Sequence, residues 1–264
     1  MAQAVPTRAP GDAEHRAREC AHSGADVVFA LGGDGTLREC AAGVLGTETG
    51  LGFLPSGTVN VMALELGVPA GAIRAARAYE EAHEIRFGVG LAGPVPFLMQ
   101  VSAGIDAFLI HSLQAREKRW LGRVAILPAV LRALARYRCP LFTVTSESGT
   151  HTVTLAVASN ISRYGGPFRL TPGALSDGSG LELFLYSGRG RSAALRFGLA
   201  LLVGKHLKLN GSRLERVRAA RLMAPSEVPL QIDGDVLPGS DRPLEVSVAS
   251  RTIRMLVPAS VETR

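Results

Sequence analysis

The chain has 264 residues, of which 47% are hydrophobic and 20% are charged, a balance typical of a globular protein with a sizeable core. It contains no apolar run of the roughly 18 residues that a membrane-spanning helix needs, and the charged first 20 residues predict no secretory signal. The net charge of +6 favours an anionic partner, for which nucleic acid and an anionic lipid surface both qualify. Three cysteines and six histidines without metal-binding or redox spacing argue against a zinc enzyme and suit a reducing cytoplasm.

A strand, a glycine turn and a helix are predicted in succession near the amino end. A helix from Asp12 to Ser23 precedes the apolar run Ala25–Leu31, which predicts a strand buried on both faces. The run ends at Gly32-Gly33-Asp34-Gly35-Thr36, and helical character resumes from Leu37 to Leu45. This is half of a βαβ unit, and it places the loop at the carboxyl end of a parallel strand, where α/β sheets bind ligands.

The loop from Gly32 to Thr36 has the composition of a phosphate-binding turn. Its glycines Gly32, Gly33 and Gly35 remove Cβ atoms that would keep a ligand from the backbone. Free N–H groups at a helix start, with the Thr36 hydroxyl, form an anion site. The Asp34 carboxylate repels phosphate, so it fits if it binds a substrate hydroxyl or holds Mg²⁺. A tight turn capped by Asp34 is the alternative, because short glycine motifs are weakly specific.

A second loop of the same kind follows the next predicted strand, Leu51–Leu54. It contains Gly57-Thr58-Val59-Asn60 and leads into a short helix, Val61–Leu66. Two strand–loop–helix units about 25 residues apart place two loops rich in amides and hydroxyls side by side.

The order of these loops and of later motifs resembles the catalytic domain of diacylglycerol and sphingosine kinases, in the bacterial lipid-kinase branch. NAD kinases and phosphofructokinases share only the first loop. The resemblance runs from about Thr7 to Pro258, nearly the whole chain. The matching stretches are, in order, Gly32 to Thr36, Gly57 to Asn60, Asn160 with Tyr164-Gly165-Gly166-Pro167-Phe168, Thr171-Pro172-Gly173-Ala174 with Asp177, and Asp233-Gly234-Asp235.

The amino-terminal region is shorter than this resemblance implies. Family members normally begin with a strand and an Asn-Pro-x-Ser/Ala-Gly loop, followed by a helix and a second strand. Here Thr7 to Ala13 matches the family's Thr-x-x-x-Gly-Asp-Ala stretch, which lies after that region. We therefore expect the domain to lack its first strand and first phosphate loop, with Thr7 as a further nucleotide contact. Without that strand, the neighbouring strand of the sheet would expose unpaired backbone N–H and C=O groups.

The hydrophobic pattern of the chain changes from helical to alternating near residue 86. Residues 70–85 are predicted to form a packing helix, and an alternating pattern with a Gly93-Pro94 turn then predicts a hairpin. We place the domain boundary here, with residues 1–86 as the nucleotide-binding domain and 87–264 as the lipid-binding domain. Asp106, after the next predicted strand, is a candidate for the metal or substrate network or a plain turn residue.

Two basic helical segments are predicted in the second domain. Residues 112–138 carry seven Arg or Lys and one Glu, with apolar residues at three- and four-residue steps. Such a helix either meets anionic lipid or covers one face of a sheet. A second helix, Ala193 to Val203, is a candidate gate for a lipid pocket. The short alternating strands around them, ending with Ile253–Val257, predict an antiparallel sandwich or barrel.

Two further acidic positions are assigned by the resemblance. It makes Asp177 a Mg²⁺ ligand, although the family more often has two adjacent acids where this chain has Asp177-Gly178; an Asx turn is the alternative. Asp235 stands where the family has the Glu that acts as general base, and it is one methylene shorter. Asn160 contacts phosphate or caps a turn, and Val61 stands where many relatives have Asp.

Taken together, the sequence predicts an α/β amino-terminal domain of the NAD kinase and phosphofructokinase type, plus a carboxyl-terminal antiparallel β-sandwich with covering helices. The resemblance implies an ATP- and Mg²⁺-dependent lipid kinase of phospholipid biosynthesis, cytoplasmic and peripheral at the inner membrane surface, with no nucleic-acid partner. The nucleotide contacts would be Thr7, Gly32 to Thr36, Gly57, Thr58 and Asn60; Asp235 and Asp34 would be catalytic. The alternatives are an NAD kinase-like enzyme with a soluble acceptor and a non-catalytic lipid- or nucleotide-binding relative.

Overall fold

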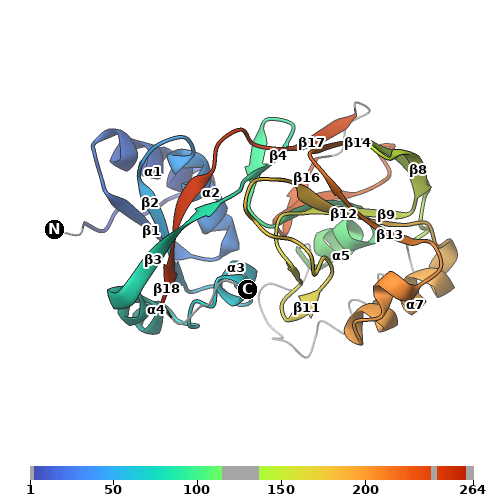
Figure 1. The fold of residues 1–264 in the computed structure, drawn as a ribbon, viewed down its shortest axis with the longest axis horizontal. Helices are drawn as coiled ribbons and strands as arrows, with labels where there is room; N and C mark the ends of the chain where they lie inside the picture. Colours follow the sequence, from blue (N-terminus) through green and yellow to red (C-terminus); the bar gives the residue numbers. More distant parts are fainter. Residues whose placement is uncertain (1–2, 115–136, 239–242, 260–264) are drawn as a thin grey trace.

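The structure, a computed structural model, describes residues 3–114, 137–238 and 243–259. Two domains lie side by side along the long axis, an α/β domain that contains the N-terminus and a domain rich in β-strands (Figure 1). The first domain is built from α1 (Asp12–His22), β1 (Val27–Gly32), α2 (Asp34–Val44), β2 (Gly50–Pro55), α3 (Val61–Glu65), α4 (Ala72–Ala78), the short helix η1 (Tyr79–Glu81) and β3 (Ala82–Phe87). The predicted helix over 70–85 thus ends early, and its last residues begin β3.

The first sheet takes its third strand from the far end of the chain. Its order is β1-β2-β18-β3, with β18 (Ile253–Pro258) parallel to β2 and antiparallel to β3. Ile253 and Met255 are buried in one core with Leu51 and Phe53 of β2. The placement of this strand in the sandwich is therefore wrong. The alternation of apolar residues predicted the strand, but it carries no information on which sheet the strand joins.

Strand β1 is buried on one face only. It pairs with β2 at the edge of the sheet, and Ala30 lies in the core. On the opposite face Phe29 and Leu31 are 43% and 61% exposed, and the Phe29 ring packs edge-on against Tyr79, with centroids 5.2 Å apart. The prediction of burial on both faces is wrong here, because an apolar run does not indicate whether a second layer covers it.

The second domain is an antiparallel β-sandwich. Within the described ranges it has two six-stranded sheets, ordered β13-β12-β9-β6-β15-β16 and β5-β4-β17-β14-β7-β8, whose facing side chains form one core. The strands are β4 (Gly90–Ala92), β5 (Val95–Phe97), β6 (Gln100–Gly104), β7 (Phe142–Ser146), β8 (Gly149–Val153), β9 (Leu155–Ser159), β12 (Leu181–Tyr186), β13 (Ser212–Val217), β14 (Ala219–Met223), β15 (Leu230–Ile232), β16 (Asp235–Leu237) and β17 (Leu244–Val248). The fold class predicted from the sequence is confirmed.

Among the described residues, three helices and a small hairpin pack on the sandwich. Helix α5 (Ile105–Gln114) follows β6, and α7 (Gly190–Leu202) with the short helix η3 (His206–Lys208) packs outside β12 and β13. The hairpin β10 (Arg163–Tyr164) and β11 (Phe168–Arg169) is the remaining pair. Most of the predicted basic helix 112–138 lies outside the described residues. None of the helices in the described part of the chain is long and apolar enough to cross a membrane.

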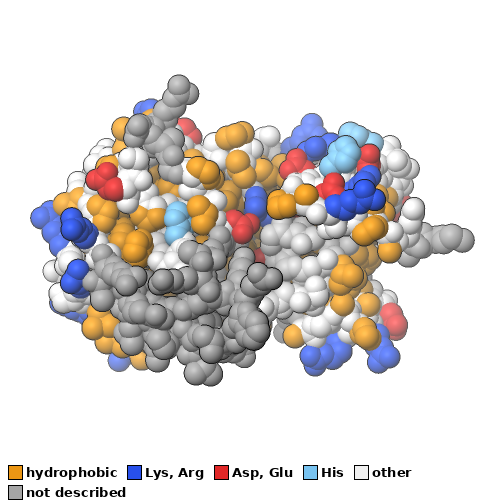
Figure 2. Space-filling model, turned by 180° about the vertical axis from the view of Figure 1, so that it is seen from behind, with side chains coloured by type: hydrophobic (Ala, Val, Ile, Leu, Met, Phe, Trp, Pro, Cys, Tyr) orange, Lys and Arg blue, Asp and Glu red, His pale blue; other side chains and the backbone are white. Residues whose placement is uncertain are grey.

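The chain crosses from the first sheet to the second between the end of β3 at Phe87 and the start of β4 at Gly90. This crossing lies close to the predicted domain boundary at residues 86–87, which stays a prediction. Seen from behind, backbone and uncharged polar atoms gather on the surface between the two domains (Figure 2). Helix α2 contacts β5 across this junction.

Candidate active site

The two glycine loops lie against each other at the carboxyl ends of β1 and β2. These strands pair in parallel register from Val27 with Gly50 to Gly32 with Pro55, so both loops emerge at the same edge of the sheet. A methyl group placed on Gly57 would lie 3.0 Å from the Cα of Gly33. Such a close backbone approach favours glycine at position 57, whereas a methyl group on Gly33 would make only ordinary contacts at 3.9 Å. The sequence prediction that the loops are neighbours is therefore met by the geometry.

Asp34 joins the two loops. Its Oδ2 accepts a hydrogen bond from the N–H of Val61 (2.8 Å) and its Oδ1 accepts one from Met62 (3.1 Å), at the start of α3. Burial raises the pKa of Asp34, and the two backbone N–H groups act in the opposite direction. The Asp34 carboxylate thus caps the N-terminus of α3. The dipole of a helix favours a negative charge at its N-terminus. A catalytic role for Asp34 stays a prediction.

We expect Asp34→Ala to lower the free energy of unfolding by about 2 kcal/mol, because two partly buried N–H groups would lose a charged acceptor. The matched control is Asp12→Ala, which removes an exposed carboxylate that accepts from Arg8 N (2.9 Å) and should cost well under half as much. Urea unfolding at pH 7 measures both. Equal losses would show that the contact between the loops is not held by Asp34.

Asp235 comes to the first loop from the other domain. It is the first residue of β16, after a turn in which Asp233 and Gly234 have φ of 49° and 84°. Its Oδ2 would lie 3.5 Å from a methyl group on Gly35 and accepts a hydrogen bond from Arg38 Nη2 at 3.1 Å. The Asp235 side chain is 47% exposed, so the carboxylate is open to a ligand. The structure therefore brings a carboxylate of the sandwich beside the glycine loop.

Arg38 is a site residue that sequence reasoning missed. It lies one helical turn after Asp34 on α2, with 18% of its side chain exposed. The only signal for Arg38 in the sequence is its position, one helical turn after the glycine loop. Many helices have a basic residue at such a position, so this signal does not single it out. Its partner lies 197 residues further along the chain, so no local pattern links the two.

Asp233 holds the turn that carries Asp235. Its buried carboxylate accepts hydrogen bonds from the backbone N–H groups of Leu98, Met99 and Gln100, at 2.8–2.9 Å. Burial raises the pKa of Asp233 from 3.8 to about 6, while the three N–H groups and Arg38 act to lower it. The turn is thereby fixed to the segment between β5 and β6.

The raised pKa of Asp233 predicts that the protein becomes less stable as the pH rises from about 4 to above 6. The folded state binds a proton that the unfolded state has already lost, so this stability is complete below pH 4 and disappears above the folded pKa of about 6. The change amounts to about 3 kcal/mol. Urea unfolding between pH 4 and 7.5 measures it. A rise in stability over this range would contradict the prediction, as would the same slope in Asp233→Asn.

A buried polar network supports the same turn. Asp106 on α5 accepts hydrogen bonds from Ser102 Oγ, Tyr164 Oη and Gln231 Nε2, the last at 3.0 Å. Burial raises the pKa of Asp106. Gln231 Oε1 in turn accepts from the N–H of Gly234 at 2.9 Å. Asp106 therefore supports the Asp235 turn through Gln231, which sequence reasoning did not single out.

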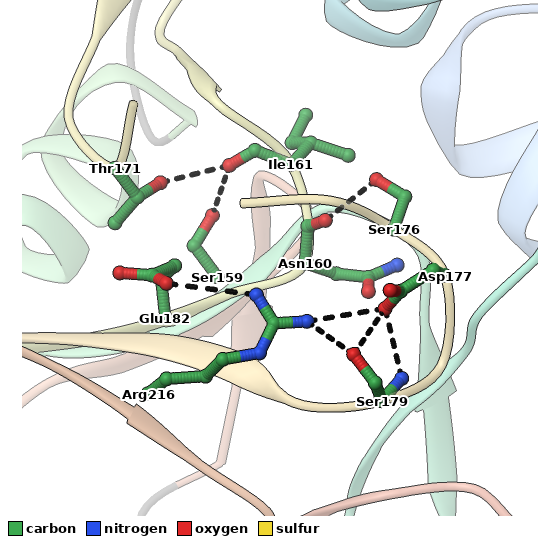
Figure 3. Close-up of polar contacts among 9 residues, drawn as sticks. All are labelled: Ser159, Asn160, Ile161, Thr171, Ser176, Asp177, Ser179, Glu182 and Arg216. Carbon is green, nitrogen blue, oxygen red and sulfur yellow. Dashed lines mark hydrogen bonds and ion pairs between the residues drawn. The ribbon is translucent and has the colours of Figure 1, made fainter. Parts of the chain in front are cut away.

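Asp177 lies in a different polar cluster, in the loop that leads into β12 (Figure 3). The preceding residue, Ser176, accepts a hydrogen bond from the N–H of Gly88 at 2.6 Å through its carbonyl. Its Oδ1 accepts from Ser179 N (2.9 Å) and Ser179 Oγ (2.6 Å) and pairs with Arg216 Nη2 (3.1 Å). The Ser179 hydroxyl, then its N–H, lower the pKa of Asp177, with a further contribution from Arg216. Arg216 also lies 3.7 Å from Glu182.

In this cluster Asp177 is paired with a cation of the chain itself, Arg216. The guanidinium of Arg216 lies 3.1 Å from Asp177 Oδ1. Among the described residues, no three His, Cys, Asp or Glu side chains gather around a point that could hold a metal. The arrangement is an Asx turn with an ion pair, the alternative weighed from the sequence. Asp177 as a metal ligand stays a prediction.

The other predicted positions are distributed as follows. The buried Asn160 amide donates to the carbonyls of Gly88 (2.7 Å) and Leu98 (3.0 Å), so its role is to join segments of the chain. Asn60 stands at the N-cap position of α3 with φ 50°, and its side-chain amide donates to Gly57 O at 2.7 Å, away from the helix. Thr58 is exposed on the second loop, and Thr7 is exposed ahead of α1.

Known protein families match both domains. The family model for the diacylglycerol kinase catalytic domain matches residues 1–92, and that for the YegS C-terminal NAD kinase beta sandwich-like domain matches residues 99–257. The second match alone covers more than half of the chain. The chain belongs to the family of diacylglycerol kinases and YegS-like lipid kinases. The recognition made from the ordered motifs is therefore confirmed, and membership makes the protein a lipid kinase.

Individual relatives agree with this assignment. The chain is 27% identical to a diacylglycerol kinase of Mycobacterium tuberculosis over 94% of its own length and 82% of the relative's. It is 28% identical to a probable lipid kinase, YegS-like, of Xanthomonas campestris, over 96% and 86%. A solved structure described as a diacylglycerol kinase of Bacillus anthracis matches the fold of this lipid kinase with a TM-score of 0.69 at 19% identity, covering 98% of this chain and 85% of that one.

Proposed function

We propose that this lipid kinase transfers the γ-phosphoryl group of ATP to the hydroxyl of a membrane lipid, namely diacylglycerol, a sphingoid base or a related lipid. The observation that carries the proposal is the approach of Asp235 to Gly35, which sets a partly exposed carboxylate beside a phosphate-binding turn. A base and a phosphoryl donor must meet in this way for transfer to a hydroxyl.

In the proposed reaction Asp235 accepts the proton of the lipid hydroxyl. The hydroxyl oxygen then forms a bond to the γ-phosphorus, the bond to the bridging oxygen breaks, and ADP leaves. The N–H groups of Asp34, Gly35 and Thr36 begin α2 without partners in the helix, so they are available to phosphate oxygens. Arg38 holds the Asp235 carboxylate toward the loop.

Mg²⁺ dependence is part of the proposal, with the ion arriving on the phosphates of ATP. The described residues contain no group of three or more potential metal ligands, and Mg²⁺ is commonly held by substrate phosphates with one or two protein carboxylates. When bound, the ion neutralises phosphate charge. We also propose a peripheral location at the inner face of the membrane, where the acceptor would lie.

The test is transfer of labelled γ-phosphate from ATP to a panel of lipids in mixed micelles, with and without a chelator of Mg²⁺. One labelled lipid would identify the acceptor. Phosphorylation of NAD without vesicles would favour the NAD kinase-like alternative. Binding of ATP with no labelled product would favour a non-catalytic relative.

A further inference from the structure

Helix α7 is apolar on both of its sides. One side is buried against β12, where the Phe197 ring stacks on Phe184 and Tyr186 with centroids 5.5 and 5.3 Å apart. The small residues Ala193, Ala194 and Ala200 complete this contact. This side alone accounts for the packing of the helix on the sandwich, because a surface helix needs a single apolar stripe.

The opposite side carries an exposed apolar row. Leu195, Leu199, Leu202 and Val203 are 46%, 57%, 58% and 67% exposed. Their spacing of four, three and one places them on one face of the helix and its end. Large apolar side chains gathered in this way on a surface mark a site of contact with a protein, a membrane or a ligand.

Cations border this row, and acids are absent from the segment. Arg196, Lys205 and Lys208 line an open groove of about 570 Å³ together with Leu199, Leu202 and Val203. From Gly190 to Gly211 the sequence contains no Asp or Glu. We call this surface the α7 face, composed of Leu195, Arg196, Leu199, Leu202, Val203, Lys205 and Lys208. Apolar residues rimmed by Lys and Arg are the pattern of a helix lying in an anionic membrane interface.

We propose that the α7 face docks on the anionic surface of a membrane leaflet, with its leucines in the acyl boundary and its cations at the headgroups. The proposal rests on the lipid-kinase function and names the surface that meets the lipid phase. A second copy of the chain is a poorer occupant, because two-fold pairing sets like patches together and would oppose their positive charges.

The position of the face suits this role. The hairpin β10–β11 lies between the two regions, with β10 packed on α3 and β11 packed on α7 (Figure 1). Helix α3 is the one that Asp34 caps in the active site. Docking through α7 therefore places the membrane and the phosphate loops on either side of one small hairpin.

Vesicle flotation in low salt tests the proposal without measuring activity. We expect the protein to bind vesicles of equal parts phosphatidylglycerol and phosphatidylcholine, and to bind pure phosphatidylcholine at least tenfold more weakly. Leu199→Gln with Leu202→Gln should weaken binding to anionic vesicles at least tenfold. The matched control is Ile73→Gln on α4, a side chain 74% exposed away from the α7 face, which should bind within twofold of the parent.

The charge contribution is tested separately. Lys205→Gln with Lys208→Gln should weaken binding severalfold and remove part of its salt dependence, whereas Arg74→Gln with Arg77→Gln on α4, exposed cations of the other domain, should not. Unchanged vesicle binding in the α7 variants would overturn the proposal, as would a parent protein that binds no vesicles. A parent dimer that the leucine variant converts to monomer would assign the face to a second copy instead.

Transfer to a short-chain diacylglycerol below its micelle concentration separates docking from catalysis. Variants that lose vesicle binding but keep this reaction within twofold support the docking face. Loss of vesicle binding in a protein that phosphorylates no acceptor would leave the docking face supported and the proposed kinase reaction rejected.

Discussion

Asp235→Asn should lower phosphoryl transfer by between about 10² and 10⁴-fold, the range for removal of a positioned general base. The amide keeps the shape of the side chain beside Gly35, but it cannot accept the proton of the lipid hydroxyl. The free energy of unfolding should change by less than about 1 kcal/mol, because the Asp235 side chain in the ion pair with Arg38 is about half exposed to solvent. Initial rates with a labelled lipid acceptor and urea unfolding of the same preparations measure the two effects.

Two further variants make this result specific to the position. Asp235→Glu restores the carboxylate on a longer arm, as in the family pattern, and should retain at least a tenth of the activity. Glu227→Gln, an exposed acid of the same domain, should leave the rate unchanged. A rate for Asp235→Asn within tenfold of the parent would show that another group, or water, takes the proton.

Gly57→Ala should lower kcat/KM for ATP by about 100-fold, because misplacement of a binding loop by about 1 Å has effects of this size. The added methyl group would lie 2.6 Å from Asn60 Oδ1 and 3.0 Å from the Cα of Gly33. The Asn60 side chain is held by its hydrogen bond to Gly57 O, and Gly33 is backbone, so the loops must separate.

The matched control for this steric effect is Gly198→Ala on α7, where a methyl group meets no atom within 4 Å. It should leave the reaction of ATP with a short-chain acceptor unchanged and stabilise the helix by about 0.5 kcal/mol. Calorimetric titration with ATP gives binding, and steady-state rates with varied ATP give kcat and KM. Unchanged ATP binding by Gly57→Ala would remove the second loop from the nucleotide site.

The parts of the protein that were predicted from sequence are those determined by neighbours in the chain. A β-branched run followed by glycines and a helical pattern defines a strand, loop and helix within about 15 residues, and both loops were located on this basis. The Gly93-Pro94 turn likewise lies between β4 and β5 as predicted. The family was recognised from the order of the motifs, which are spread over nearly the whole chain.

Long-range pairing was decided by the tertiary structure alone. Strand β18 joins the first sheet beside β2, about 200 residues earlier in the chain, although its alternation fits either sheet. Arg216 forms an ion pair with Asp177, and Arg38 forms one with Asp235. In each pair the two residues belong to segments that are distant in the sequence. A side chain's chemistry limits its possible partners, but only the fold brings one of them within hydrogen-bond distance.

Exposure was the second property that the sequence left open. The same apolar character buries Ala30 and leaves Leu31 in solvent on β1, and it buries Phe197 and exposes Leu199 on α7. Hydrophobicity is a property of each residue, whereas burial depends on whether another layer covers that face. The sequence therefore determined the glycine loops, the carboxylates and the family, and the tertiary structure decided which of these groups meet and which apolar face remains open.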